Sequence, residues 1–168
     1  MEVYTEESCT TNEENLVQVY IEIEQFSNIK YEYNKQTNEL EIDRILIQPY
    51  IYPYAYGFIL NTLAEDGDEL DILIISESTF KNDMCYKVYI IGALDMEDEK
   101  GRDQKVLCVF DDDYDKIKDI SDLSDGIKEN IHSFFANYKK EVPGKWSTVA
   151  EFMNKTEAVS LYNKSKIS

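Results

Sequence analysis

The chain has 168 residues, of which 34 are acidic and 17 basic, so its formal net charge is −17. This length is typical of a single domain, and a 43% hydrophobic content with 13 Tyr and 7 Phe indicates a globular protein rich in β-structure. So acidic a protein is not expected to bind nucleic acid or an anionic membrane surface.

The beginning of the chain, "MEVYTEESCT", is acidic and polar, without the basic region and apolar core of a signal peptide. No apolar run approaches the length that spans a bilayer. The cysteines Cys9, Cys85 and Cys108 are widely spaced and form no CxxC pair, which is typical of reduced thiols. We therefore expect a cytoplasmic protein with no membrane partner.

Residues 1–15 are acidic and lack periodicity, so we expect a loosely ordered arm, followed by one domain over residues 16–168. Segments rich in Val, Ile and Tyr predict strands, and "NKQTNE" at 34–39 predicts the turn of a hairpin. Strands this short, separated by turns, are typical of a sandwich or a small barrel. The predicted strands cover residues 16–23, 28–34, 39–47, 56–60, 70–76, 87–96 and 105–110.

Helical periodicity is found only late in the chain. Residues 124–140 place apolar side chains on one helical face, with Lys139 and Lys140 in the expected last turn. Asn154, with Glu157 three residues later, resembles a capping box that opens a second helix. The apolar face consists of Ile127, Ile131, Phe134, Phe135 and Tyr138.

The stretch "AEDGDELDILIIS" crowds four carboxylates against an apolar strand. Period-two alternation places Asp71 inside that strand, on a face that is otherwise apolar. A carboxylate there needs a cation, a hydrogen-bond donor or water. The stretch is therefore either a solvated turn or a site for a divalent cation, which prefers oxygen ligands.

Other charged residues interrupt predicted strands or follow them. Each could be an ordinary surface charge, but carboxylates interleaved with Lys, Arg and Tyr suit a metal-complexed phosphate ester or anhydride. The residues are Glu22, Lys30, Glu32, Arg44, Asp98, Asp103 and Lys105.

Competing motifs fail on spacing. An EF-hand needs Gly at its sixth position, where a loop starting at Asp66 has Asp71 and one starting at Asp111 has Lys116. No P-loop, GxGxxG, HExxH or GxSxG motif occurs. We interpret "DDDYD" at 111–115 as a solvated loop.

Five blocks in unbroken order resemble family I soluble inorganic pyrophosphatases. "DGDELD" is similar to the Asp-x-Asp-x-x-Asp signature of that family, and the likeness extends from about Val19 to Trp146. The other blocks are "YIEIEQFSNIKYEYNKQTNELEIDRIL", "YPYAYGFILNTL", "DEKGRDQKVL" and "SFFANYKKEVPGKW".

The resemblance implies an α+β fold, mainly β: a highly twisted five-stranded OB-like barrel flanked by two C-terminal helices. It also implies hydrolysis of pyrophosphate to two phosphates by a metal-activated water in an in-line displacement. Several Mg²⁺ ions are expected as cofactors, with Mn²⁺ or Zn²⁺ as substitutes. A homo-oligomer is expected, with a hexamer favoured over a dimer or trimer.

The resemblance assigns roles by position. Asp68 matches the general base. Metal ligands are implied at Asp66, Asp71, Asp98, Asp103 and Glu22. Groups that hold the phosphoryl ends are implied at Lys30, Arg44, Tyr56, Lys105, Tyr138 and Lys139. Supporting groups are implied at Glu32, Tyr52 and Lys145.

Three positions depart from the family pattern. Glu69 replaces a proline, and we interpret it as a plain surface residue. Ala55 replaces an asparagine. Arg102 replaces an acidic residue, and a cation there would lower the metal affinity of Asp103 or shift its metal preference. Two alternatives also stay open: a catalytically silent binding module, and a phosphohydrolase acting on a nucleotide or a short polyphosphate.

Overall fold

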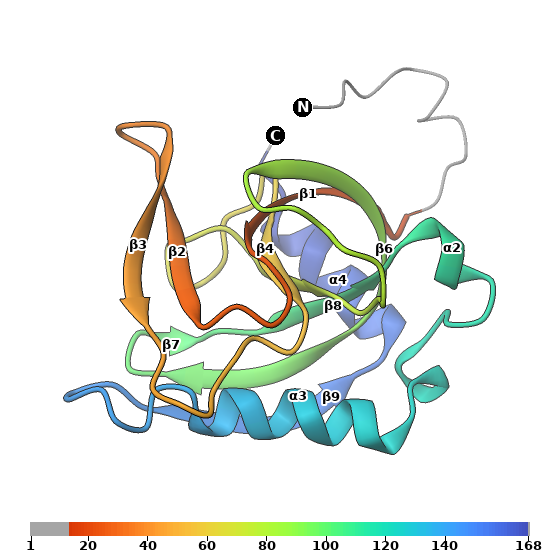
Figure 1. Ribbon diagram of the computed structural model, residues 1–168. Coiled ribbons are helices and arrows are strands. Elements are labelled where there is room, and N and C mark those ends of the chain that lie inside the picture. The colour runs from red at the N-terminus through yellow and green to blue at the C-terminus, as the bar shows by residue number, and fades with distance from the viewer. Residues whose placement is uncertain (1–13, 168) are drawn as a thin grey trace.

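The computed structural model describes residues 14–167, so the predicted arm, apart from its last two residues, and Cys9 lie outside the described residues (Figure 1). The strands are β1 Leu16–Ile23, β2 Ile29–Asn34, β3 Glu39–Ile45, β4 Ala55–Ile59, β5 Asp71–Ile74, β6 Met84–Asp98, β7 Gly101–Arg102, β8 Lys105–Val109 and β9 Ser147–Met153. The helices are α2 Asp111–Tyr114, a 3-10 turn at Ile120–Asp122, α3 Asp125–Asn137 and α4 Lys155–Ser165.

Five strands form a closed ring. The order β1-β4-β5-β8-β6 closes because β1 also pairs with β6, and only β5 and β8 run parallel within it. The long strand β6 also pairs with β7 and β9, while β2 and β3 form a separate hairpin beside the ring (Figure 1). The predicted mainly β fold with a five-stranded core and flanking helices is confirmed.

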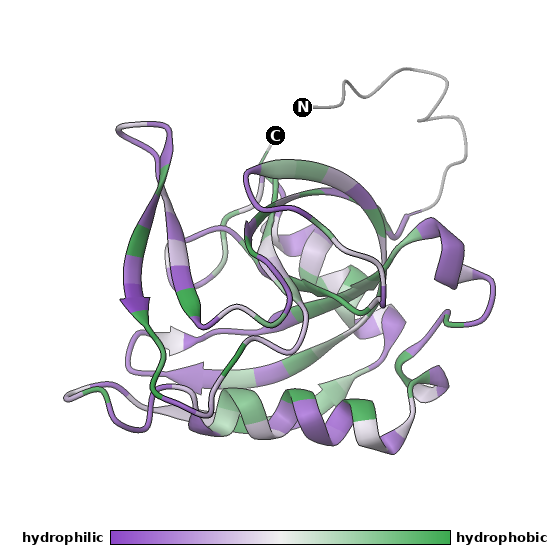
Figure 2. Ribbon diagram, viewed as in Figure 1, coloured by the Kyte–Doolittle hydropathy of each residue, from purple (hydrophilic) through white to green (hydrophobic). Residues whose placement is uncertain are grey.

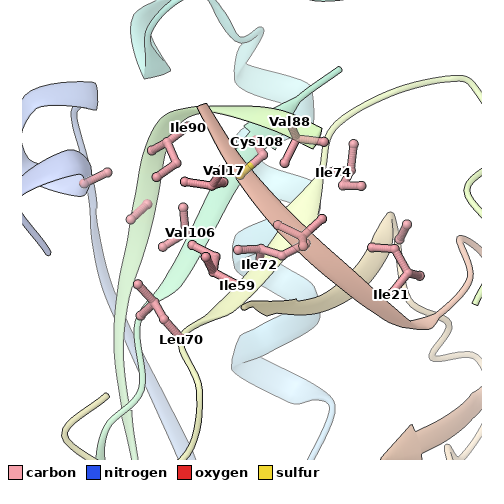
Figure 3. Packing of buried hydrophobic residues seen from close by; sticks show 14 of the residues in the cluster. Val17, Ile21, Ile59, Leu70, Ile72, Ile74, Val88, Ile90, Val106 and Cys108 are labelled. Atoms are coloured by element: carbon pink, nitrogen blue, oxygen red, sulfur yellow. The ribbon is translucent and has the colours of Figure 1, made fainter. Parts of the chain in front are cut away.

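The alternation predicted for β5 is confirmed, but both of its faces are buried. Ile72 and Ile74 belong to the cluster enclosed by the ring, where Figure 3 shows them with Val17 and Val106. Leu73 instead packs in a second cluster that includes Phe135 of α3. Because α3 covers this outer face of the ring, the strand is apolar on both sides.

The two predicted helices are present, and the capping box expected at Asn154 is formed. The Ser124 side chain accepts a hydrogen bond from Ile127 N, and Asn154 and Glu157 form a reciprocal capping box. The prediction that Lys139 and Lys140 lie in the last turn of α3 is wrong. The helix ends before both residues, and Lys139 instead forms an ion pair with a carboxylate of the ring. Among the described residues, no helix is long and apolar enough to cross a membrane.

Besides the two-residue strand β7 and the 3-10 turn, two elements were not predicted. The strand β9 follows α3 and precedes α4 in the chain, and among the described strands it pairs only with β6. This edge position leaves much of β9 exposed and makes its apolar pattern weak. The short helix α2 covers residues predicted as a solvated loop. The three aspartates of its first turn suit a helix N-terminus, which is the signal that could have identified it.

Gly57 of β4 lies directly against the backbone of β1. A Cβ atom added at Gly57 would lie 1.9 Å from the carbonyl oxygen of Tyr20. We expect Gly57→Ala to lower the free energy of unfolding by about 1–3 kcal/mol, because the two strands must separate to admit the methyl group. Urea denaturation measures the change. Gly126→Ala is the control, since a Cβ there meets nothing within 4 Å; equal stability of the two variants would contradict the prediction.

Candidate active site

A polar pocket of about 330 Å³ lies where four separate segments meet: the β2–β3 hairpin, the loop before β5, the turn after β6 and the end of α3. Except for Arg44 and Tyr52, every predicted site residue lines it. These lining residues are Glu22, Lys30, Glu32, Tyr56, Asp66, Asp68, Asp71, Asp98, Asp103, Lys105, Tyr138, Lys139 and Lys145.

The acidic loop, residues 65–71, presents Asp66 and Asp68 to the pocket. Gly67 has a positive φ of 89°, which closes a tight turn, and Asp68 N donates a 3.1 Å hydrogen bond to Asp66 Oδ1. Burial raises the pKa of Asp66, and the negative charges of Asp103 and Asp68 add to the effect. A cation in the pocket would relieve this repulsion.

Lys105 lines the pocket and is 1% exposed. The parallel register of β5 and β8 pairs it with Asp71, so that its Nζ lies 2.7 Å from Asp71 Oδ2 and 2.9 Å from Asp103 Oδ2. Nζ also donates to the Tyr56 hydroxyl over 2.9 Å. Burial acts to lower the pKa of Lys105, but the facing carboxylates outweigh it and hold that pKa well above its usual value.

Two further lysines form ion pairs with carboxylates around the pocket. Lys139 Nζ lies 2.8 Å from Asp98 Oδ2, and Lys30 Nζ lies 2.7 Å from Asp43 Oδ2. Burial acts to lower the pKa of Lys139, and Asp98 is among the groups that raise it overall. The pocket thus alternates anions and cations, an arrangement able to hold both metal ions and phosphoryl oxygens.

Arg44 and Tyr52 lie beside the pocket rather than in its lining. The three guanidinium nitrogens of Arg44 and the Tyr52 hydroxyl are buried and find no hydrogen-bond partner among the described residues. The Arg44 guanidinium lies 5.6 Å from the centre of the Tyr138 ring, and Tyr138 does line the pocket. A buried guanidinium without a partner is costly, and an anionic ligand would satisfy it.

Glu22 connects the ring to the hairpin. Its carboxylate accepts a 2.9 Å hydrogen bond from Tyr33 N at the far end of β2. Burial raises the pKa of Glu22 to about 8, and Asp71 contributes to the increase. Because a metal ligand must be deprotonated, a cation bound by Glu22 would displace a proton near neutral pH.

The carboxylates of the pocket have the oxygen chemistry that Mg²⁺ requires. Within residues 14–167, however, no three His, Cys, Asp or Glu side chains are already arranged to hold a metal ion. Two reasons are visible: the Lys105 ammonium lies between Asp71 and Asp103, and neighbouring carboxylates repel one another when no cation is bound. The donor set fits a hard divalent cation that draws these carboxylates together.

Several residues that line the pocket were not predicted from the sequence: Lys35, Asp43, Glu69, Glu99 and Lys100. Glu69, which we interpreted as a plain surface residue, forms an ion pair with Lys35. Glu99 and Lys100 lie within "DEKGRDQKVL", so they could have been identified from that block. Nothing in the local pattern distinguishes Lys35 or Asp43 from ordinary hairpin charges.

Arg102 has its own partner outside the pocket. Its Nη2 lies 2.7 Å from Asp95 Oδ1, and it is not among the residues that line the pocket. The charge that we expected to weaken metal binding at Asp103 is therefore neutralised mainly by Asp95.

Comparison with known protein families gives a match over nearly the whole described chain. A family model described as inorganic pyrophosphatase matches residues 19–167. An inorganic pyrophosphatase of Nanoarchaeum equitans is 47% identical over 146 residues, covering 84% of this chain and 90% of the relative. An inorganic pyrophosphatase of Helicobacter pylori is 41% identical over 150 residues, covering 87% of each chain.

Solved structures agree with the sequence matches. An inorganic pyrophosphatase structure from Helicobacter pylori has a TM-score of 0.88 at 37% identity, covering 98% of this chain and 95% of that one. An inorganic pyrophosphatase structure from Thermus thermophilus has a TM-score of 0.87 at 36% identity, covering 98% and 94%. The similarity therefore includes the ring, the hairpin and the helices.

Proposed function

The chain belongs to the inorganic pyrophosphatase family and is an inorganic diphosphatase, and from this premise we propose that it hydrolyses pyrophosphate in the pocket with Mg²⁺ as cofactor. The observation that carries the proposal is the lining of the pocket, where the five predicted carboxylate ligands and the predicted base Asp68 lie beside lysines and tyrosines. Carboxylates suit the metal, and the cations suit the phosphoryl oxygens of the substrate.

Asp66, Asp71, Asp98, Asp103 and Glu22 would hold several Mg²⁺ ions. When bound, such ions lower the pKa of water and neutralise phosphoryl charge. Asp68 is proposed as the general base that orients the attacking water and accepts its proton. This role is supported by its position in the pocket, by its exposure, and by the absence of any cation paired with its carboxylate among the described ion pairs.

The cationic side of the pocket is proposed to hold the two phosphoryl ends for an in-line displacement. Lys30, Lys105, Lys139 and Arg44 would neutralise phosphoryl oxygens, and Tyr138 would add a hydroxyl donor. Burial raises the pKa of Tyr56 well above its usual value, so its hydroxyl stays protonated and able to donate a hydrogen bond. Glu32, Tyr52 and Lys145 are proposed to support these groups.

The proposal is tested by phosphate release from pyrophosphate. We expect turnover with Mg²⁺, none in EDTA, and full recovery when Mg²⁺ is added back, since the carboxylates need a cation to bind the anionic substrate. Parallel assays with Mn²⁺ and Zn²⁺, and with ATP and tripolyphosphate, establish metal and substrate preference. Turnover that persists in EDTA, or a preference for ATP or tripolyphosphate, would contradict the proposal.

We also propose a cytoplasmic homo-oligomer, with a hexamer favoured. The free buried thiols of Cys85 and Cys108 support a reducing compartment. Exposed apolar side chains at Phe26, Ile45 and Ile47 support contact with further copies of the chain. Light scattering measures the mass in solution, and a monomer would contradict this proposal.

A further inference from the structure

One ion pair joins the hairpin to the acidic loop. Lys35, in the turn between β2 and β3, places its Nζ 3.0 Å from Glu69 Oε1. Both side chains line the pocket. Of the ion pairs between residues 14 and 167, this one alone connects the two segments.

The hairpin turn that carries Lys35 is held firmly. Asn34 Oδ1 accepts hydrogen bonds from Gln36 N and Thr37 N, and Asn38 N donates to Asn34 O over 2.7 Å. Next to this turn the hairpin is anchored to the ring, because Tyr33 N donates a hydrogen bond to the Glu22 carboxylate and the Tyr33 ring packs edge-on against Tyr20 at 5.1 Å. Lys35 therefore extends from a supported element.

The acidic loop has few restraints of its own. Its turn is closed by three local hydrogen bonds: Ala64 N donates to Asp68 O, Gly67 N to Ala64 O, and Asp68 N to Asp66 Oδ1. Asp68 is exposed, whereas Leu70, two residues later, is 1% exposed in the core. Glu69 lies between them, so a contact at Glu69 restrains the point where the loop leaves the core.

We propose that the Lys35–Glu69 ion pair is a latch that fixes the acidic loop against the hairpin and positions Asp66 and Asp68 for metal binding. Lys35 is a positioning residue that acts through Glu69. The effect on metal binding rests on the proposed function, whereas the restraint of the loop does not.

The latch and simple electrostatics predict opposite changes in cation binding when the charge of Lys35 is removed. Lys35 Nζ interacts with the charges of Asp68 and Glu22 as well as Glu69, so removing its positive charge would by itself strengthen the binding of a cation in the pocket. If Lys35 holds the loop, its removal weakens cation binding instead. Substituting Glu69 cannot make this distinction, because loss of a negative charge weakens cation binding under either explanation.

The test is Mg²⁺ titration by calorimetry of Lys35→Gln, Glu69→Gln and the double variant. We expect Lys35→Gln to weaken Mg²⁺ binding about two- to fivefold, the range of an exposed ion pair. The double variant should bind Mg²⁺ no more weakly than Glu69→Gln, since the latch is broken only once and the charge of Lys35 no longer opposes the cation. Turnover at saturating Mg²⁺ should stay within about twofold of wild type, because the loop is ordered once the metal is bound. At about 1 M salt, where the screening length is about 3 Å, the difference between wild type and Lys35→Gln should disappear.

Hydrogen exchange without metal tests the restraint directly. The amides of Gly67 and Asp68 should exchange about two- to fivefold faster in Lys35→Gln than in wild type. Lys128→Gln is the matched control, because it breaks another exposed ion pair, with Asp125 at the start of α3, outside the pocket lining. The Mg²⁺ affinity of Lys128→Gln and the amide exchange rates in its acidic loop should equal those of wild type.

Equal or tighter Mg²⁺ binding by Lys35→Gln would overturn the positioning role, and unchanged amide exchange would overturn the latch. If wild type neither binds Mg²⁺ nor releases phosphate, the proposed function fails, and the exchange experiment still decides whether the latch exists.

Discussion

Asp68→Asn is expected to lower kcat for pyrophosphate hydrolysis by about 10²- to 10⁴-fold, the usual contribution of a general base. The amide keeps the size of the side chain and its place in the pocket but cannot accept the proton of the attacking water. Since Asp66 and Asp71 supply the neighbouring carboxylates, Mg²⁺ affinity should change only a few-fold, about one screened charge.

The measurement is phosphate release at saturating Mg²⁺, together with Mg²⁺ titration of the same protein. Glu65→Gln is the matched control, because Glu65 belongs to the same loop but is exposed and not among the residues that line the pocket. It should keep the turnover of wild type. Unchanged turnover in Asp68→Asn would remove Asp68 from the base role.

Lys105→Met is expected to lower the free energy of unfolding by about 3–5 kcal/mol in EDTA, the usual cost of breaking a buried ion pair. The substitution keeps most of the side-chain length but leaves Asp71 and Asp103 facing each other without their ammonium partner. Added Mg²⁺ should restore part of the loss, because a divalent cation can neutralise the same two carboxylates.

Urea denaturation in EDTA and in Mg²⁺ measures both parts of this prediction. Lys140→Met provides the control: Lys140 neighbours Lys139 in the chain but is exposed, so its loss should change stability by less than about 0.5 kcal/mol. A Lys105→Met protein as stable as this control would contradict the burial argument. If Mg²⁺ stabilises Lys105→Met no more than it stabilises wild type, the idea that Mg²⁺ and Lys105 neutralise the same two carboxylates, Asp71 and Asp103, is contradicted.

Local patterns predicted most of the ring. Alternating and β-branched segments located β1, β4, β5 and β8, and the polar turn at 34–39 located the hairpin, because these signals depend on neighbours in the chain. The same signals missed β9, whose stability comes from pairing with β6. They also misplaced Lys139, because an ion pair across the fold, and not the helix dipole, determines where that side chain lies.

The candidate site likewise has features that could be predicted from the sequence and features that could not. Residue types and spacing, together with the family resemblance, identified the carboxylates and most of the cations that line the pocket. The carboxylates with which those cations form ion pairs could not be identified from the sequence. Lys105 meets Asp71 because β5 and β8 pair in parallel with those two residues in register, and the Lys30 and Lys35 pairs depend on how the hairpin folds.

The residue types alone indicate which chemistry is available to this protein, because the type of side chain sets whether a group can bind a metal, hold a phosphoryl oxygen or accept a proton. Which of these groups face one another follows only from the fold. The register of β5 against β8 placed an ammonium between two carboxylates, and the position of the hairpin brought Lys35 to Glu69. Both depend on contacts between residues more than thirty positions apart, for which a local pattern contains no signal.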